Sequence, residues 1–362
     1  MVEPVQSPPP LTRAVVDRDA ESRVDEGFPE RFDADPTARV LALRAGRMLL
    51  AERVDGSAPA LDLRHPSAFP EPILRLYLGR GADGAPLEAR VFDDDAADAI
   101  EPQDARWAGL RVAGMIFADE AADEAADEAA DESGGASSGE ADFAAALATE
   151  AVALATWHER NPFCPRCGGA TEPVQRGWAR RCLVDDSLQF PRTDPAVIVL
   201  VTDDDDRVLL GSNAMWAKGR FSLLAGFVEP GESFEAAVVR EIREEAGLAV
   251  DRIEYRASQP WPFPASLMIG LTARVAAGVD PKVAEPDGEE ILELRWFTRD
   301  ELASATGDVV LPGTVSIARW LLEGWYGGAL PGGDAAWTSA TPAIAAETSA
   351  GSETSAAPKA AS

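Results

Sequence analysis

Three glutamates on one predicted helix are the side chains best placed to carry out chemistry. Residues 234–246 contain neither Gly nor Pro and are followed by Gly247, a pattern that predicts a helix. Glu241, Glu244 and Glu245 are spaced i, i+3, i+4, so they share one helix face. Crowded carboxylates repel one another unless a cation lies between them, and an all-oxygen cluster suits Mg²⁺ or Mn²⁺. A site of this kind would bind a diphosphate.

The residues around these glutamates resemble the full Nudix box. Gly226, Glu232 and the run REIREEAGL over residues 240–248 match its fixed positions. A solvated acidic helix face is the simpler interpretation, but it does not explain agreement at so many positions. The resemblance implies a Nudix hydrolase, in which water attacks a phosphorus of a nucleoside diphosphate linked to another group. In that family Arg240 would orient the loop acid Glu232.

A second motif, SQPWPFPAS, occupies residues 258–266, which are predicted to form a loop. Its three prolines stiffen the chain, and Trp261 and Phe263 offer flat faces for a base or a nicotinamide ring. Together with the cysteine pattern described below, this motif resembles the NADH pyrophosphatase subfamily of Nudix hydrolases. The resemblance covers residues 157–325 strongly, and the N-terminal domain only by position and size.

The resemblance assigns further residues to the site. It implies that Mg²⁺ or Mn²⁺ is held by Glu241, Glu245, Glu290 and the backbone carbonyl of Ala225. Either Glu244 or Glu290 would take the proton from the attacking water. The dinucleotide would contact Phe190, Phe227, Gln259, Pro260, Trp261, Pro262, Phe263, Pro264, Ala265, Ser266 and Ala318. Members of the subfamily are commonly dimers, so the resemblance also implies a homodimer.

All three cysteines of the chain lie in one short segment and indicate a zinc ribbon. Cys164 and Cys167 form a CxxC knuckle, and Cys182 lies where a second knuckle would begin. The position of the expected fourth cysteine is Asp185, whose carboxylate is a candidate fourth zinc ligand. Further candidate donors are Asp186 and His158. The alternative is a ribbon held by packing alone, and in either case its role would be structural.

Charge and composition exclude several classes of protein. The formal net charge is −29, with 62 acidic against 33 basic residues, so an extended nucleic-acid groove is not expected. The first residues lack the basic and apolar regions of a signal peptide, and no apolar run is long enough to span a membrane. Three cysteines in 362 residues indicate a reducing compartment. We therefore expect a cytoplasmic protein with a small-molecule dinucleotide substrate and no membrane contact.

The elements that must position these residues fall into successive regions. We expect a disordered N-terminus (1–35), a β-rich N-terminal domain (36–117), an acidic low-complexity insertion (118–141), a helix (142–160), a zinc-ribbon-like segment (161–193), a Nudix hydrolase domain (194–327) and a disordered tail (328–362). Strands are predicted in the hydrolase domain at 196–201, 207–210, 221–225, 253–257, 267–275 and 293–297, with further helices at 300–303 and 314–325. The expected fold class is α+β, an α-β-α Nudix sandwich with a mixed sheet.

The predicted activity is metal-dependent hydrolysis of the diphosphate of NADH or NAD⁺ to nicotinamide mononucleotide and AMP. Some members of the subfamily also remove NAD caps from RNA. One alternative is a less selective Nudix hydrolase of ADP-ribose or other nucleoside diphosphate derivatives, against which only residues 258–266 argue. Another is a Nudix module that senses a nucleotide without cutting it, against which the intact glutamates argue. A nucleic-acid-binding zinc ribbon is opposed by the negative charge.

Overall fold

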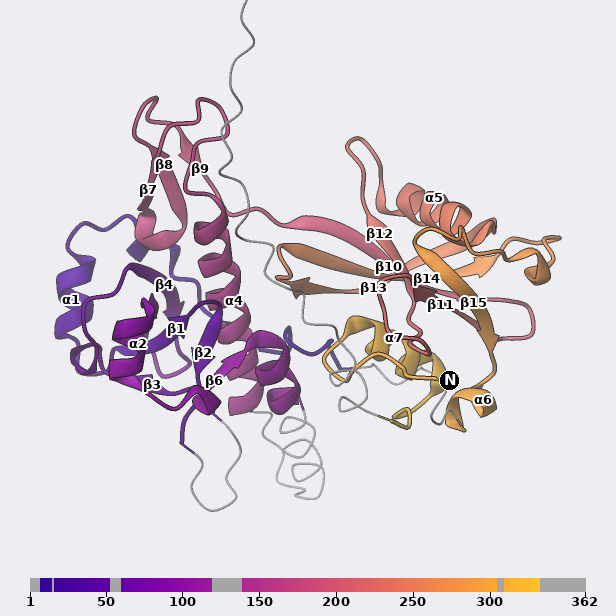
Figure 1. The fold of residues 1–362 in the computed structure, drawn as a ribbon, viewed down its shortest axis with the longest axis horizontal. Coiled ribbons are helices and arrows are strands. Elements are labelled where there is room, and N and C mark those ends of the chain that lie inside the picture. The colour runs from indigo at the N-terminus through magenta and orange to yellow at the C-terminus, as the bar shows by residue number, and fades with distance from the viewer. Residues whose placement is uncertain (1–6, 15, 53–59, 119–138, 305–308, 333–362) are drawn as a thin grey trace, which may run out of the picture.

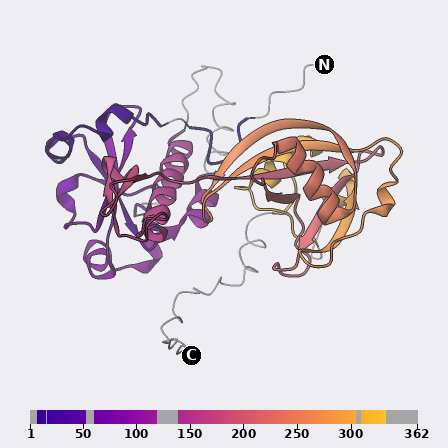
Figure 2. The ribbon, with the colours of Figure 1, turned by 90° about the horizontal axis from the view of Figure 1, so that it is seen from above.

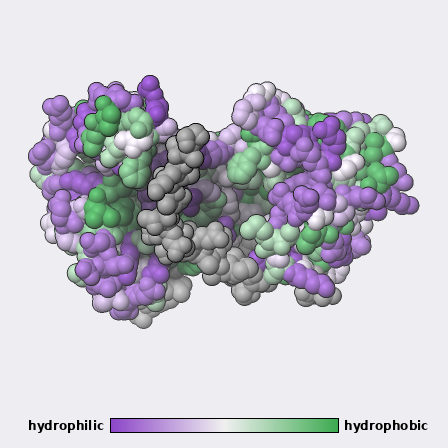
Figure 3. Space-filling view, turned by 45° about the horizontal axis from the view of Figure 1, so that its top comes forward, coloured by the Kyte–Doolittle hydropathy of each residue, from purple (hydrophilic) through white to green (hydrophobic). Residues whose placement is uncertain are grey.

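The computed structural model describes residues 7–14, 16–52, 60–118, 139–304 and 309–332. Two lobes lie side by side, with the N-terminal half of the chain in one and the C-terminal half in the other (Figures 1 and 2). Hydrophilic residues cover most of the face drawn in Figure 3, and hydrophobic residues form separate patches on both lobes. Within the described residues, no helix is both long and apolar enough to cross a membrane.

The N-terminal lobe is built on a six-stranded sheet of order β4-β5-β1-β2-β6, with β3 paired to β1. Its strands are β1 (Arg39–Arg44), β2 (Arg47–Leu49), β3 (Leu63–Arg64), β4 (Leu74–Arg80), β5 (Pro86–Val91) and β6 (Trp107–Gly109). Its helical segments are η1 (Ala20–Arg23), α1 (Phe28–Ala34), η2 (Pro66–Ala68), α2 (Asp94–Ile100), η3 (Asp104–Arg106) and residues 110–118. The predicted β-rich character of this region is confirmed.

Helix α4 (Glu140–Arg160) packs on this lobe and leads into the ribbon. Its buried leucines and alanines join the core formed by β1, β4 and β5. The ribbon is a three-stranded sheet of β7 (Thr171–Val174), β8 (Ala179–Cys182) and β9 (Leu188–Gln189), with η4 (Gln175–Gly177) between the first two. The ribbon therefore stands directly before the C-terminal lobe.

The C-terminal lobe contains a second six-stranded sheet, of order β13-β14-β10-β11-β15, with β12 paired to β10. The strands are β10 (Asp194–Thr202), β11 (Val208–Asn213), β12 (Leu224–Phe227), β13 (Val250–Trp261), β14 (Ser266–Val275) and β15 (Ile291–Phe297). The helices are α5 (Phe234–Ala246), η5 (Pro281–Val283), α6 (Arg299–Ala303) and α7 (Ile317–Tyr326). The sheet is mixed, because β10 runs parallel to β14 and antiparallel to β12.

Alternation along β10 explains why helices cover both faces of this sheet. Val197 and Val199 join the core beneath α5, whereas Ile198 and Leu200 join the core beneath α7. Every residue from position 196 to 201 is buried, as expected of a strand covered on both sides. The predicted α-β-α sandwich with a mixed sheet is confirmed.

The N-terminal segment differs from the prediction of disorder for residues 1–35. Trp320 of α7 donates its indole N–H to the Ser7 carbonyl at 2.7 Å, and Leu11 is buried in the core of the N-terminal lobe. Phe28 and Phe32 of α1 are buried beside Tyr77. Apolar side chains of this segment therefore hold it against the N-terminal lobe, and its backbone carbonyl at Ser7 bonds to the C-terminal lobe.

Two predicted low-complexity regions lie largely outside the described residues. These are the acidic insertion at 118–141 and the tail at 328–362. Several element boundaries also differ from the prediction, and those of β13 and α7 bear on the site. β13 continues to Trp261, so much of the segment predicted as a loop is a strand that turns back only at residues 262–265. Helix α7 begins at Ile317, because the Ser316 hydroxyl accepts hydrogen bonds from the N–H groups of the first turn.

Candidate functional site

Helix α5 presents its glutamates from a firmly seated position. Its first turn is capped by the Ser233 hydroxyl, which accepts the Ala236 N–H at 3.2 Å. It ends at Gly247, whose φ of 65° is left-handed and so favours glycine. Val238 and Ile242 are fully buried against the sheet. The opposite edge of the helix therefore faces outward in a fixed orientation.

Arg240 lies at the centre of the charged groups. Its Nε and one Nη donate to the two oxygens of Glu232, both at 2.9 Å. Its other Nη donates to Glu241 at 2.8 Å and to Glu244 at 3.0 Å. These bonds lower the pKa of Glu232 and raise that of Arg240. The structure thus brings Glu232, Glu241 and Glu244 around one guanidinium group.

Glu245 lies within the same group of acids but is not balanced by a cation. Its side chain is 4% exposed, and its Oε2 has no hydrogen-bond partner among the described residues. Burial, followed by the negative charges of Glu241 and Glu290, raises its pKa to about 8. We call Glu241, Glu244, Glu245 and Glu290 the carboxylate cluster. An unpartnered carboxylate oxygen amid other acids fits a hard divalent cation.

Gly226 allows the backbone of β12 to approach the carboxylate cluster. A Cβ atom at this position would lie 2.0 Å from the carboxyl carbon of Glu241, so a larger residue would displace that carboxylate. Gly226 pairs with Val197 of β10, and the preceding Ala225 pairs with Ile198. The backbone beside Ala225 is therefore next to Glu241, as a carbonyl ligand to the same cation would require.

Glu290 comes to the cluster from a turn in another part of the lobe. The Asn213 amide donates to its carboxylate at 3.3 Å, and Asp287 Oδ1 accepts the backbone N–H groups of residues 289, 290 and 291, each at 2.9 Å. Asp287 therefore shapes the turn that carries Glu290. The sequence prediction did not identify Asp287, because its role depends on hydrogen bonds to backbone groups.

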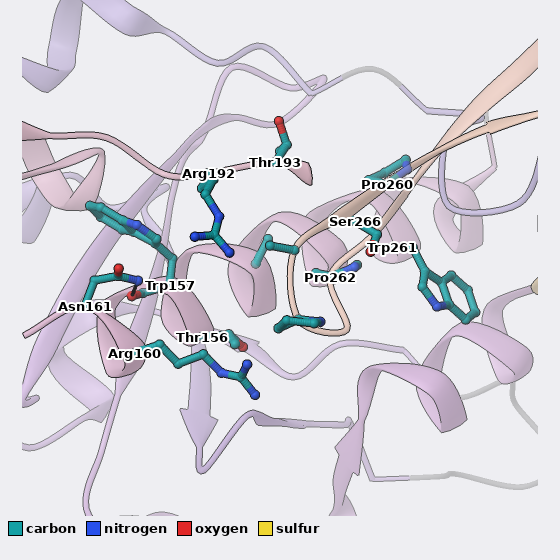
Figure 4. A pocket seen from close by; sticks show the side chains of 13 residues that line it. Thr156, Trp157, Arg160, Asn161, Arg192, Thr193, Pro260, Trp261, Pro262 and Ser266 are labelled. Atoms are coloured by element: carbon teal, nitrogen blue, oxygen red, sulfur yellow. Dashed lines mark hydrogen bonds between the residues drawn. The ribbon is translucent and has the colours of Figure 1, made fainter. Parts of the chain in front are cut away.

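The tip of the β13–β14 hairpin lines a cavity of about 260 Å³ against the end of α4. The predicted residues Pro260, Trp261, Pro262, Pro264, Ala265 and Ser266 line it. Trp157, Arg160 and Arg192, which the prediction did not include, line the other side (Figure 4). Trp157 and Arg160 belong to α4, and Arg192 belongs to the link into β10. No sequence spacing relates these residues to the hairpin.

Two residues predicted to contact substrate lie in the interior instead. Gln259 is fully buried: its amide donates to the Pro10 and Val315 carbonyls at 2.6 and 2.8 Å, and its oxygen accepts the Ile317 N–H at 2.9 Å. Ala318 is 3% exposed and belongs to the core beneath α7. With its hydrogen bonds already made, Gln259 holds the hairpin in place and does not face the cavity.

The remaining predicted aromatic residues are arranged in two ways. Trp261 and Phe263 form an edge-to-face pair with ring centroids 5.1 Å apart, and the Arg111 guanidinium lies 4.5 Å from the Phe263 ring centre. Phe190 and Phe227 are instead 60% and 57% exposed. Of the predicted aromatic residues, these two are the most exposed, so their rings could stack on a base.

The three cysteines gather at the ribbon with one carboxylate. Donor atoms of Cys164, Cys167, Cys182 and Asp185, which we call the ribbon cluster, all lie within 4.8 Å of one another. Asp186 and His158, the two other predicted zinc donors, are both among the described residues but do not belong to the ribbon cluster. His158 is buried, and both of its ring nitrogens have partners. Its Nε2 lies 2.8 Å from the Gly177 carbonyl oxygen, and its Nδ1 lies 2.8 Å from a guanidinium nitrogen of Arg180. Three sulfurs and one oxygen at this spacing fit a tetrahedral zinc ion.

Comparison with known proteins identifies two domains. Residues 192–315 match the NUDIX domain, and residues 159–190 match the NADH pyrophosphatase zinc ribbon domain. A Mycobacterium tuberculosis protein named NAD-capped RNA hydrolase NudC is 47% identical over 194 residues, 51% of this chain and 61% of that protein. A human protein named NAD-capped RNA hydrolase NUDT12 is 38% identical over 195 residues, 50% of this chain and 41% of that one.

Among solved structures, a NUDIX hydrolase from Nitrosomonas europaea aligns with 46% of this chain and 94% of its own at 24% identity, with a TM-score of 0.35. The chain covers less than two thirds of the length of either named relative. Residues 159–315 thus contain a NUDIX domain preceded by an NADH pyrophosphatase zinc ribbon domain.

Proposed function

We propose that this chain, in which a NUDIX domain follows an NADH pyrophosphatase zinc ribbon domain, hydrolyses the diphosphate of NADH or NAD⁺ to nicotinamide mononucleotide and AMP. We include NAD-capped RNA among its substrates, because similar proteins carry that name. The observation that carries the proposal is the buried, unpartnered Glu245 among further carboxylates, in the lobe that also bears the hairpin cavity.

The proposed reaction divides the work among the residues of the carboxylate cluster and Ala225. Glu241, Glu245, Glu290 and the Ala225 carbonyl would hold Mg²⁺ or Mn²⁺. The cation, when bound, polarises phosphoryl oxygens and makes hydroxide available near neutral pH. Arg240 keeps Glu232 and the loop before α5 in place through its paired hydrogen bonds.

Glu244 and Glu290 are both candidates to accept the proton of the attacking water. Glu244 already accepts a hydrogen bond from Arg240, whereas Glu290 accepts one from the Asn213 amide. The variants Glu244→Gln and Glu290→Gln separate the two. Loss of turnover in Glu244→Gln with its affinity for Mn²⁺ retained would identify Glu244 as the acceptor. Turnover near the wild-type rate in Glu244→Gln, with loss of both turnover and Mn²⁺ affinity in Glu290→Gln, would favour Glu290, which also holds the cation.

The substrate would lie between the carboxylate cluster and the hairpin cavity. The sheet register supports this arrangement, since Ser266 pairs with Asp194 and Gly226 pairs with Val197 on the same strand. Three residues of strand correspond to about 10 Å, so both features lie toward one end of the sheet. Phe190 and Phe227 would stack on the bases, and residues 260–266 would border the dinucleotide.

We also propose a structural zinc ion at the ribbon cluster, a homodimer and a cytoplasmic location. The zinc ribbon match and the four clustered donors support the ion. The dimer rests on the resemblance to the subfamily alone. Free thiols at all three cysteines suit a reducing compartment.

The test is incubation with Mg²⁺ or Mn²⁺ and, separately, NADH, NAD⁺, a short NAD-capped RNA or ADP-ribose, with products identified by mass. We expect reduced nicotinamide mononucleotide and AMP from NADH. Much faster cleavage of ADP-ribose than of NADH would instead establish the less selective hydrolase. Tight binding of NADH with no cleavage of any substrate would establish a sensing module.

A further inference from the structure

The cavity at the hairpin tip has an unusual charge for this protein. The formal net charge of the chain is −29, yet the charged residues that line the cavity are Arg160 and Arg192. No Asp or Glu belongs to its described lining. Figure 4 shows the two arginines extending into the space between α4 and the hairpin. A local excess of positive charge on an acidic protein favours an anionic ligand.

The hydrogen bonds of these arginines leave donors available. Nε and one Nη of Arg192 contact the carboxylate of Asp194 at 2.8 and 3.0 Å, so its other Nη remains free to bind a ligand. The side chain of Arg160 forms no hydrogen bond or ion pair with any described residue. Its place in the last turn of α4 would also stabilise the helix end, which is the role to be distinguished from ligand binding.

The cavity is too far along the sheet to hold the scissile diphosphate itself. Ser266, which lines the cavity, pairs with Asp194 of β10. Gly226, which lies beside the carboxylate cluster, pairs with Val197, three residues further along the same strand. This separation is about 10 Å in the strand direction. A phosphate bound by the two arginines would therefore be another group on the same substrate.

We infer that Arg160 and Arg192 bind a phosphate on the adenosine ribose of the substrate, outside the diphosphate that is cut. This inference rests on the proposed function. The nicotinamide ribose carries no further phosphate, whereas the adenosine ribose carries one in two cases: the 2′-phosphate of NADPH and the 3′-phosphodiester of NAD-capped RNA. The inference places the adenosine half over the hairpin, where guanidinium groups are well suited to bind a phosphate.

The experiment compares wild type with the double variant Arg160→Ala/Arg192→Ala on NADH, NADPH and a short NAD-capped RNA. We expect kcat/KM for the substrates with the additional phosphate to fall roughly tenfold or more, as loss of hydrogen bonds to a charged group predicts. Turnover of NADH should be nearly unchanged. The exposed Arg256 of β13 does not line the cavity, so Arg256→Ala is the matched control for loss of positive charge.

Each outcome decides the inference. A loss confined to NADPH identifies the 2′-phosphate as the ligand, and a loss confined to the capped RNA identifies the phosphodiester. An equal loss on all three substrates, or no loss on any, overturns the inference. The melting temperature of the double variant shows whether an equal loss comes from a weakened α4 end.

Binding separates failure of this inference from failure of the proposed function. Adenosine 3′,5′-bisphosphate, adenosine 2′,5′-bisphosphate and AMP can be titrated by calorimetry, which needs no catalysis. Wild type should bind at least one bisphosphate more tightly than AMP, and the double variant should lose that preference. Equal affinity of wild type for all three nucleotides would overturn the inference, even if NADH is hydrolysed.

Discussion

The carboxylate cluster and the ribbon cluster both gather side chains that suit a metal ion, but they differ in how their charge is balanced. In the carboxylate cluster, Arg240 bonds to Glu241 and Glu244, while Glu245 is buried without a partner. In the ribbon cluster, four donor atoms from Cys182 of β8 and from the turns around one small sheet lie within 4.8 Å of one another. The first cluster would need a cation from outside the chain to balance Glu245, and the second offers four donors that would enclose one.

This difference shows how a site for chemistry differs from a site for stability. Four protein donors around zinc leave no position for a substrate, which is typical of a structural site. The carboxylate cluster lies at a surface, since Glu290 is exposed, and it holds Glu245 with a pKa raised to about 8. Such an arrangement lowers the stability of the metal-free protein but leaves room for a diphosphate.

The largest expected effect follows from Glu245→Gln, which preserves shape but removes the charge that would anchor the cation. We predict a folded protein that still binds NADH but turns over at least ~100-fold more slowly. Melting temperature, NADH binding and turnover should be measured on one preparation, with the exposed Glu254→Gln on β13 as the control. Turnover near the wild-type rate would remove Glu245 from the proposed mechanism.

Substitutions in the ribbon cluster should instead lower stability and leave turnover little changed. We predict about one zinc ion per chain in protein purified without chelator or a metal-affinity tag. Cys167→Ser should abolish zinc binding and lower the melting temperature, with turnover of the remaining folded protein little changed. Asp185→Cys should retain zinc, whereas Asp186→Ala should leave its affinity unchanged. Elemental analysis showing no zinc in an intact wild-type fold would favour a ribbon held by packing alone.

A smaller expected effect is the pH dependence of stability that Glu245 of the carboxylate cluster causes in the metal-free protein. The pKa of Glu245 is about 8 in the folded protein, against an ordinary value of 4.5. As pH rises, Glu245 therefore loses its proton in the unfolded chain before it does so in the folded protein. The metal-free protein should lose stability between about pH 4.5 and about pH 8, because ionisation favours the unfolded chain there. Above that range the contribution should be constant.

The metal-free Glu245→Gln variant lacks this destabilising ionisation. The free energy of unfolding of the variant should therefore exceed that of wild type by an amount that grows from about pH 4.5 to about pH 8. Urea unfolding with a chelator present measures the difference at each pH. An advantage that does not vary with pH would show that Glu245 is already balanced without metal. Added Mn²⁺ should reduce the difference, because it binds the ionised wild-type cluster.

The smallest effect is expected at a segment that belongs to neither cluster. Residues 118–140 contain the acidic repeat and no predicted site residue. We predict that their deletion leaves turnover and zinc content unchanged. A large loss of turnover in a deletion protein with a normal melting temperature would show that the repeat does more than interact with solvent.

The sequence by itself determined the features that depend on neighbours within one element. The boundaries of α5, from the Ser233 cap to Gly247, and the shared face of Glu241 and Glu245 follow from local capping and helix periodicity. The buried strand β10 was similarly evident from a continuous apolar run. The cysteine spacing likewise placed the three thiols near one another, and Asp185 joins them.

Only the tertiary structure decided what surrounds residues 258–266. Gln259 is buried because it bonds to Pro10, a residue 249 positions away, and to the chain before α7. The cavity beside it acquires Arg160 and Arg192 because α4 and the link into β10 pack near the hairpin tip. These contacts join segments whose local patterns are independent, so no spacing within the sequence could reveal them. Packing of distant segments therefore determined that Ser266 lines the cavity and Gln259 does not.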